Sequence, residues 1–169
     1  RTYRIQLSDY AAVELRPLFR LAEEQAPGIR FDFARLPREP MDADRDLLAH
    51  DFAVAPPGIG IDVDSMELFR DEYVVIADRA NPLVAGGTLT LDDFLASPYI
   101  RCDFGRSHLT QVERRMHELD VHPSIRVTTS TMLSIPLIVR GTDLVGVVPR
   151  RLVERSADAT GTVAVATPF

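Results

Sequence analysis

Three short polar segments each follow an apolar, strand-like segment and precede a helical pattern, so their side chains could bind a small polar or anionic group. They are Ser8-Asp9, Asp103 to Ser107 and Thr129-Ser130-Thr131. In open α/β sheets, ligands bind beyond the carboxyl ends of the strands, where helix N-termini present free backbone N–H groups. We therefore expect these segments to hold a small-molecule ligand.

The predicted ligand site includes residues in and beside these segments: Ser8, Asp9, Tyr10, Pro56, Asp103, Phe104, Arg106, Thr129, Ser130 and Met132. Each residue type also has a purely structural role. The serines are favoured as helix N-caps, and the aromatic residues and the methionine are equally compatible with core packing. Pro56 could only end a strand, and Arg106 could be a solvated charge. The expected ligand is a small, largely apolar or aromatic molecule with one polar or anionic group.

Signatures of the common enzyme classes do not occur in the sequence. There is no Gly-x-Ser-x-Gly elbow, P-loop or His-Glu-x-x-His, and Gly58-Ile59-Gly60 does not open a helix as a dinucleotide-binding turn does. The four histidines match no metal-ligand spacing, and Cys102 is interpreted as a small buried strand residue. The sequence therefore predicts a protein that is not an enzyme and has neither a cofactor nor a metal.

Composition narrows the range of partners. The 169 residues are 46% hydrophobic, which is enough for a packed core, and 19 basic against 25 acidic residues give a net charge of −6. A surface of this sign repels phosphate backbones, so we expect no direct contact with nucleic acid. No apolar run approaches the roughly 18 residues that span a bilayer. With one cysteine and no signal-peptide pattern, the chain is expected to be cytoplasmic and to make no membrane contact.

The first part of the chain alternates strand and helix patterns. Residues 3–7 and 29–33 have the period-two pattern of strands, and the apolar run Phe52 to Ala55 is typical of a central parallel strand. A helix is expected over Ala12 to Ala26, with a kink or restart at Pro17, and a short one over Asp42 to His50. This order predicts a parallel sheet with helices on both sides.

A second α/β cycle follows a β-rich segment, Met66 to Ala77, that could run from one lobe into the next. The expected elements are a helical turn at 92–95, strands at 99–102, 125–129 and 144–148, helices at 109–119, 131–140 and 150–154, and a last strand at 162–166. We expect the first part of lobe one in residues 1–75, lobe two in 76–148, and a return to lobe one in 149–169.

Four phrases in this order resemble the effector-binding domain of LysR-type transcription regulators. They are Leu7-Ser8-Asp9-Tyr10, Ala26-Pro27-Gly28-Ile29, the segment from Leu68 to Val74 followed by Asn81-Pro82-Leu83, and Gly141 to Pro149. Asn81 replaces the family's usual His, and Thr142-Asp143 departs slightly from its pattern. The first phrase is similar to the branch that contains nodulation regulators and regulators of aromatic catabolism.

This resemblance implies two Rossmann-like lobes joined by two crossover strands, as in type 2 periplasmic-binding proteins, with effector bound between the lobes. It also implies a homodimer or tetramer, an absent N-terminal winged helix-turn-helix domain that makes the DNA contact, and a family tail that continues past Phe169. Self-association is expected through lobe one, along its helix and its Phe-rich strand at 31–33.

Two other functions fit the same scaffold. An extracytoplasmic solute-binding protein of a transporter would use the same cleft and would carry a signal peptide upstream. A dehydratase-like enzyme would need an acid/base pair in the cleft, for which only Asp9, Asp103 and His108 are candidates.

Overall fold

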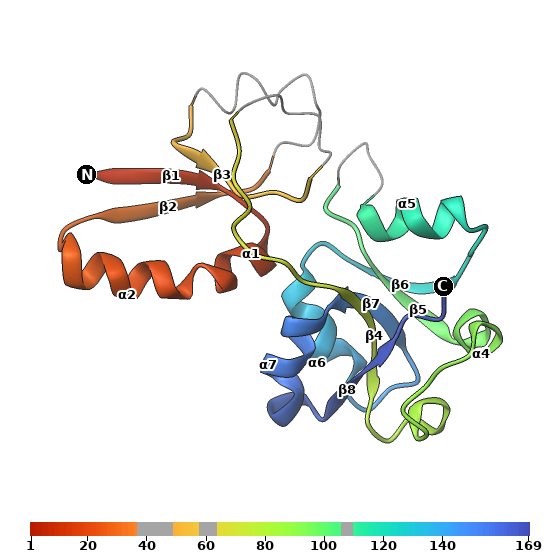
Figure 1. Cartoon of the computed structure of the whole chain (residues 1–169). Helices are drawn as coiled ribbons and strands as arrows, with labels where there is room; N and C mark the ends of the chain where they lie inside the picture. The colour runs from red at the N-terminus through yellow and green to blue at the C-terminus, as the bar shows by residue number, and fades with distance from the viewer. Residues whose placement is uncertain (37–48, 58–63, 106–109) are drawn as a thin grey trace. The chain divides into compact units, whose positions relative to one another are not determined.

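The computed structural model describes residues 1–36, 49–57, 64–105 and 110–169. They form two compact units, Arg1–Ser65 (unit 1) and Met66–Phe169 (unit 2), each with its own β-sheet and helices (Figure 1). The fold class is α/β, as the sequence predicts. The helix expected at 42–50 and the Gly58-Ile59-Gly60 turn fall largely or wholly outside the described residues. No helix of the described part is both long and apolar enough to cross a bilayer.

Unit 1 is built on a three-stranded parallel sheet in the order β2-β1-β3. Its elements are β1 (Thr2–Gln6), α1 (Asp9–Glu14), α2 (Arg16–Gln25), β2 (Arg30–Ala34) and β3 (Phe52–Ala53). Ile5 and Leu7 pack with Ala11 and Leu15 in its core. The expected break near Pro17 is confirmed, because Pro17 lies in the first turn of α2, where its missing N–H costs no helical hydrogen bond.

Two expectations for unit 1 are wrong. Phe52 lies at the edge of the sheet and is 57% exposed, so β3 is not the buried central strand that its apolar run suggests. In the period-two pattern of residues 3–7, Gln6 alternates with the apolar Ile5 and Leu7 and is expected on the solvent face, but it is only 1% exposed. β1 is the central strand, and Gln6 is flanked in register by Ala34 and Ala53, whose small side chains leave room for it.

Unit 2 is built on a five-stranded mixed sheet in the order β6-β5-β7-β4-β8. Its strands are β4 (Tyr73–Asp78), β5 (Pro98–Cys102), β6 (Ser124–Thr129), β7 (Val145–Pro149) and β8 (Thr162–Ala166). Its helices are α4 (Leu91–Ala96), α5 (Gln111–Glu118), α6 (Ile135–Val139) and α7 (Arg150–Thr160), with 3-10 turns η1 (Pro82–Val84) and η2 (Met132–Ser134).

Both faces of this sheet are covered. Val75, Ala77 and Val147 point to one face and share a core with Phe94 of α4 and Met116 of α5. The alternate residues of the same strands point to the other face, against which α6 and α7 pack. β4 and β7 are therefore apolar on both sides, and all five residues of β7 are buried.

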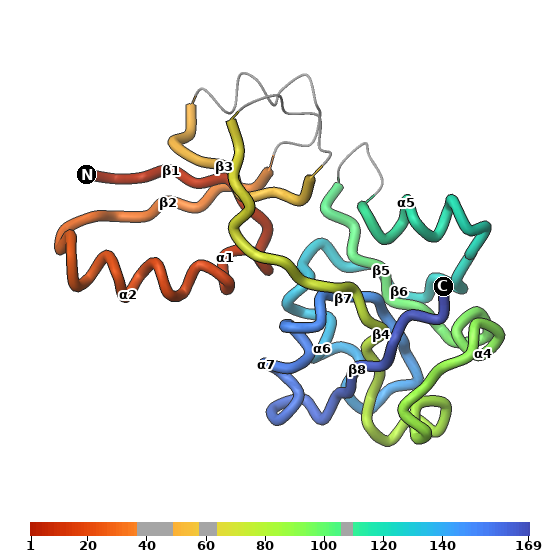
Figure 2. The backbone as a smooth tube through the Cα atoms, viewed as in Figure 1, coloured from red at the N-terminus to blue at the C-terminus, as the bar shows by residue number. Residues whose placement is uncertain are grey.

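The end of the chain differs from the expected return to lobe one. β8 pairs antiparallel with β4 along its whole length, so that early and late segments of unit 2 lie side by side (Figure 2). The helix expected at 150–154 extends to Thr160 and ends at Gly161, whose φ of 66° suits glycine. Residues 149–169 therefore belong to unit 2.

The segment that leads into unit 2 also differs from its prediction. Residues 66–72 form no strand, and β4 begins only at Tyr73. The segment is instead held at the start of α7, where Arg150 donates its backbone N–H to Glu72 O at 2.9 Å and its guanidinium pairs with the Glu72 carboxylate. The guanidinium of Arg151 lies over the Phe69 ring at 5.5 Å. The boundary between the units thus falls ten residues earlier than expected, at 65/66 instead of 75/76.

Candidate functional site

The predicted residues of unit 1 lie at the carboxyl ends of two adjacent parallel strands. Ser8 follows β1, and Pro56 follows β3, which pairs with β1. Ser8 is the N-cap of α1, and its Oγ accepts a hydrogen bond from Ala11 N at 3.1 Å. The cap role is therefore confirmed. Asp9 is half-buried, Tyr10 is 9% exposed and Pro56 is exposed.

The predicted residues of unit 2 meet at the carboxyl ends of β5 and β6. These strands are parallel neighbours with Cys102 in register with Thr129, and Asp103 N donates to Thr129 O at 2.8 Å. Phe104 follows and is half-buried, whereas Met132 is 7% exposed and belongs to the core. Arg106 lies outside the described residues.

Three hydroxyl groups form a cluster after β6. Ser134 Oγ lies 2.9 Å from both Thr129 Oγ1 and Thr131 Oγ1, and it donates to Thr131 O at 2.9 Å. Thr131 N donates to Thr129 Oγ1 at 3.3 Å. Sequence reasoning missed Ser134, although the spacing Thr129-x-Thr131-x-x-Ser134 places the three hydroxyls around one turn.

The expected N-cap role of Ser130 is wrong. The residue before η2 is Thr131, in extended geometry and without a side-chain cap hydrogen bond, and the helix expected at 131–140 divides into η2 and the five-residue α6. Ser130 itself is exposed. The neighbouring hydroxyls of Thr129, Thr131 and Ser134 bond one another, and Ser130 takes no part in these hydrogen bonds.

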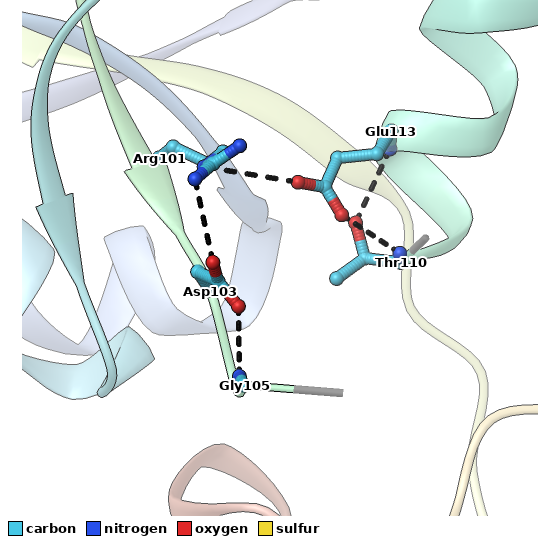
Figure 3. Close-up of polar contacts among 5 residues, drawn as sticks. All are labelled: Arg101, Asp103, Gly105, Thr110 and Glu113. Carbon is cyan, nitrogen blue, oxygen red and sulfur yellow. Dashed lines mark hydrogen bonds and ion pairs between the residues drawn. The ribbon is translucent and has the colours of Figure 1, made fainter. Parts of the chain in front are cut away.

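Arg101, which the sequence did not single out, lies beside the predicted site. Its Nη2 is 3.3 Å from Asp103 Oδ2, and its Nε is 3.9 Å from Glu113 Oε1 (Figure 3). Asp103 Oδ1 accepts from Gly105 N at 2.7 Å, while Thr110 and Glu113 form a capping box at the start of α5. The sequence signal was an arginine within the otherwise apolar strand of residues 99–102.

Two tyrosines of this sheet have raised pKa values. Burial raises the pKa of Tyr99 far above its usual range, and the Glu113 carboxylate raises it further. Burial likewise raises the pKa of Tyr73. Within the described segments, no three His, Cys, Asp or Glu side chains gather as metal ligands do. The polar groups described after β5 and β6 are the hydroxyls of Thr129, Thr131 and Ser134 and the Asp103 carboxylate, which pairs with Arg101.

A separate open hollow of about 330 Å³ lies between α2 and the start of β2. Phe19, Ala22, Glu23 and Ile29 are among its lining residues. None of the predicted ligand residues lines it, so it gives no support to the predicted site.

Comparison with known proteins places this geometry in context. A sequence model described as the LysR substrate binding domain matches residues 1–168. Nodulation protein D 2 of Rhizobium tropici is 27% identical over 162 residues, covering 93% of this chain and 50% of its own length. The HTH-type transcriptional regulator LinR of Sphingobium indicum is 27% identical over 173 residues, covering 100% of this chain and 56% of its own. The chain thus spans about half the length of the curated relatives it matches.

Solved structures of regulators share the fold. A probable transcriptional regulator, PA0477 of Pseudomonas aeruginosa, superposes with a TM-score of 0.87 at 24% identity, over 100% of this chain and 58% of that one. The CcmR regulatory domain of Synechocystis in complex with 2-PG superposes with a TM-score of 0.80 at 17% identity, and the match covers 97% of this chain and 79% of that one. The effector-binding domain of QuiR in complex with shikimate superposes with a TM-score of 0.70 at 15% identity, and the match covers 98% of this chain and 80% of that one. These likenesses establish a type 2 periplasmic-binding-protein-like fold.

Proposed function

The chain belongs to the LysR substrate-binding domain family, the effector-binding domain of LysR-type transcription regulators, and we propose that it senses a small molecule through groups that follow its parallel strands. The observation that carries this proposal is the position of the polar groups. In each unit they lie at the carboxyl ends of parallel strands, which is where α/β proteins bind ligands. The proposed contacts are Ser8, Asp9, Tyr10 and Pro56 from unit 1, and Asp103, Phe104, Arg106, Thr129, Ser130 and Met132 from unit 2.

The proposed effector is small and largely apolar or aromatic, with one polar or anionic group. Exposed Ser130 and the hydroxyls around Thr129 supply hydrogen bonds without charge, and half-buried Phe104 supplies apolar surface. A carboxylate suits such donors, and shikimate, bound by the structurally similar QuiR domain, carries one. In this mechanism the effector shifts the balance between two conformations because it binds one of them more tightly.

The proposed assembly is a cytoplasmic homodimer or tetramer in which a separate N-terminal winged helix-turn-helix domain contacts DNA. The net charge of −6 on this chain argues against direct contact with phosphates. The curated relatives extend beyond the matched region, and one of them is named as an HTH-type regulator. The proposed self-association surface is the exposed side of α2 and the edge strand β2, where Leu21 is 46% and Phe33 41% exposed.

The test is a binding experiment with single hydroxyl deletions. A thermal-shift screen of cyclic and aromatic carboxylates, shikimate included, identifies a ligand, and calorimetry then compares variants. Ser8→Ala and Ser130→Ala are each expected to weaken binding by about 0.5–1.5 kcal/mol, the value of one hydrogen bond. Ser130 caps no helix, so its loss of affinity is expected without loss of stability.

Ser8→Ala also removes a helix cap, and Thr90→Ala is its matched control. Thr90 caps α4 through Asp93 N at 3.1 Å and is no part of the proposed site. Both variants are expected to lower the melting temperature, but only Ser8→Ala to weaken binding. Unchanged affinity in both serine variants would contradict the proposed site, and the absence of any stabilising carboxylate would contradict the proposed effector chemistry.

A further inference from the structure

Arg101 links two carboxylates that belong to opposite ends of one connection. Asp103 immediately follows β5, and Glu113 lies in the first turn of α5. The arginine reaches the first at 3.3 Å and the second at 3.9 Å, with its side chain 34% exposed (Figure 3). Its Nε atom is buried and makes no hydrogen bond, so the contact with Glu113 is a charge–charge interaction.

Each carboxylate in turn fixes a backbone amide. Asp103 Oδ1 accepts from Gly105 N at 2.7 Å, and Gly105 adopts a left-handed φ of 68°. Glu113 Oε2 accepts from Thr110 N at 2.8 Å, and Thr110 Oγ1 accepts from Glu113 N at 3.2 Å. One guanidinium therefore acts on two backbone turns at once.

We propose that Arg101 is a positioning residue that holds the two described ends of the β5–α5 connection, and with them Asp103 and Phe104. The part of this assignment that concerns effector binding depends on the proposed function, since Asp103 and Phe104 are proposed contacts. Arginine suits the role because its planar fork presents several donors in fixed directions, whereas a lysine ammonium is a single point charge. Without Arg101, neither carboxylate would retain the ion pair that the described residues give it.

Such pairs contribute little to global stability when they are partly exposed, so the expected effect is local. The chain contains no tryptophan, and Phe104→Trp therefore introduces a single fluorophore beside the pair. In this background, Arg101→Gln is expected to lower the fluorescence anisotropy of Trp. Hydrogen exchange of the Gly105 and Thr110 amides, measured by NMR on the unmodified chain and its Arg101 variants, is expected to accelerate roughly 1.4- to fivefold.

Two further variants separate positioning from a general effect of charge. Arg115→Gln removes an α5 arginine that pairs with Glu118 at 3.5 Å on the exposed side of the helix, and it is expected to leave both amides unchanged. Arg101→Lys retains the charge but engages one carboxylate at a time, so it is expected to restore protection at only one of the two amides.

Equal hydrogen-exchange rates of the Gly105 and Thr110 amides in Arg101→Gln and Arg115→Gln would overturn the proposal. Equal acceleration at Gly105, Thr110 and the core amides of Val75 and Ile76 would overturn it too, because Arg101 would then act on the stability of the whole unit. None of these readouts uses a ligand. Failure here is therefore distinguishable from failure of the serine variants to alter effector binding.

Discussion

Gly146 shows how a single residue sets the packing of unit 2. It lies within fully buried β7, and a Cβ atom added there would stand 2.9 Å from Ile100 Cγ2, 3.4 Å from Ile100 O and 3.4 Å from Ile135 Cγ2. The shortest of these distances is to Ile100 of the neighbouring strand β5, so a Cβ here would require Ile100 to shift. Gly146 therefore allows β7 to lie close to Ile100 and, on the same side, to Ile135 of α6.

Replacing Gly146 with alanine is expected to destabilise the protein by about 1–3 kcal/mol, the usual cost of overpacking a core. Urea unfolding measures the change. The matched control is Gly86→Ala, since nothing lies within 4 Å of a Cβ at that position. Equal stability of the two variants would show that Ile100 can shift without cost.

Ser8 and Ser130 mark how far residue types alone predict a site. Both are serines that follow a strand, and the sequence assigns both as N-caps. Ser8 caps α1, whereas the turn after β6 brings Thr131 and Ser134 together and leaves Ser130 outside their hydrogen bonds. Competition among neighbouring hydroxyls depends on backbone angles that the residue types do not specify. The sequence did not indicate Arg101 for a related reason. Its two carboxylate partners become neighbours only once β5 and α5 are in place.

At the scale of elements, one carboxylate joins β4 to the turn that precedes β7. Asp78 Oδ2 accepts from Gly141 N at 2.5 Å, and its Oδ1 accepts from Ala80 N at 2.8 Å. These two backbone donors lower the pKa of the Asp78 carboxyl below its ordinary value. The ionised form is therefore favoured in the folded protein.

A carboxyl with a lowered folded-state pKa stabilises the fold above its ordinary, unfolded pKa, and this stabilisation is lost as the pH falls through the lowered value. Asp78→Asn is thus expected to be less stable than the wild type at pH 7, with the difference narrowing towards pH 3. Melting temperatures across this range measure it. Thr142→Ala, which removes hydroxyl hydrogen bonds from the same turn without removing a carboxyl, is the control and should differ from the wild type by an amount that does not narrow in this way. A constant difference between Asp78→Asn and the wild type would refute the linkage.

Most elements were predictable because their signals are local. Alternation, proline and glycine positions locate the strands and the restart of α2 at Pro17. The neighbours of a strand are not a local property. Residues 145–148 and 162–166 have similar apolar patterns. These patterns do not indicate which strand each one pairs with, and so do not predict that β8 pairs with β4. The expected return of 149–169 to lobe one failed for this reason.

At the scale of the whole molecule, unit 1 presents apolar side chains on an open edge. Leu21→Arg is expected to reduce self-association because it places a charge on the exposed side of α2, beside the edge strand β2. Sedimentation velocity at high micromolar concentration measures the change. Leu83→Arg, at a position of similar exposure in unit 2, is the control and should associate as the wild type does. A wild-type chain that is monomeric under these conditions would contradict the proposed surface.

The position of β4 between β7 and β8 has a consequence for synthesis on the ribosome. β4 is the first strand of unit 2 to be made, yet both of its hydrogen-bonded neighbours are among the last. Until they emerge, the apolar residues of β4 have no strand to pair with, and contacts between distant segments form slowly. Unit 1 pairs strands that are much closer in the chain, so it is expected to fold first during translation. A nascent chain stalled before β8 would then expose β4 to chaperones and to aggregation.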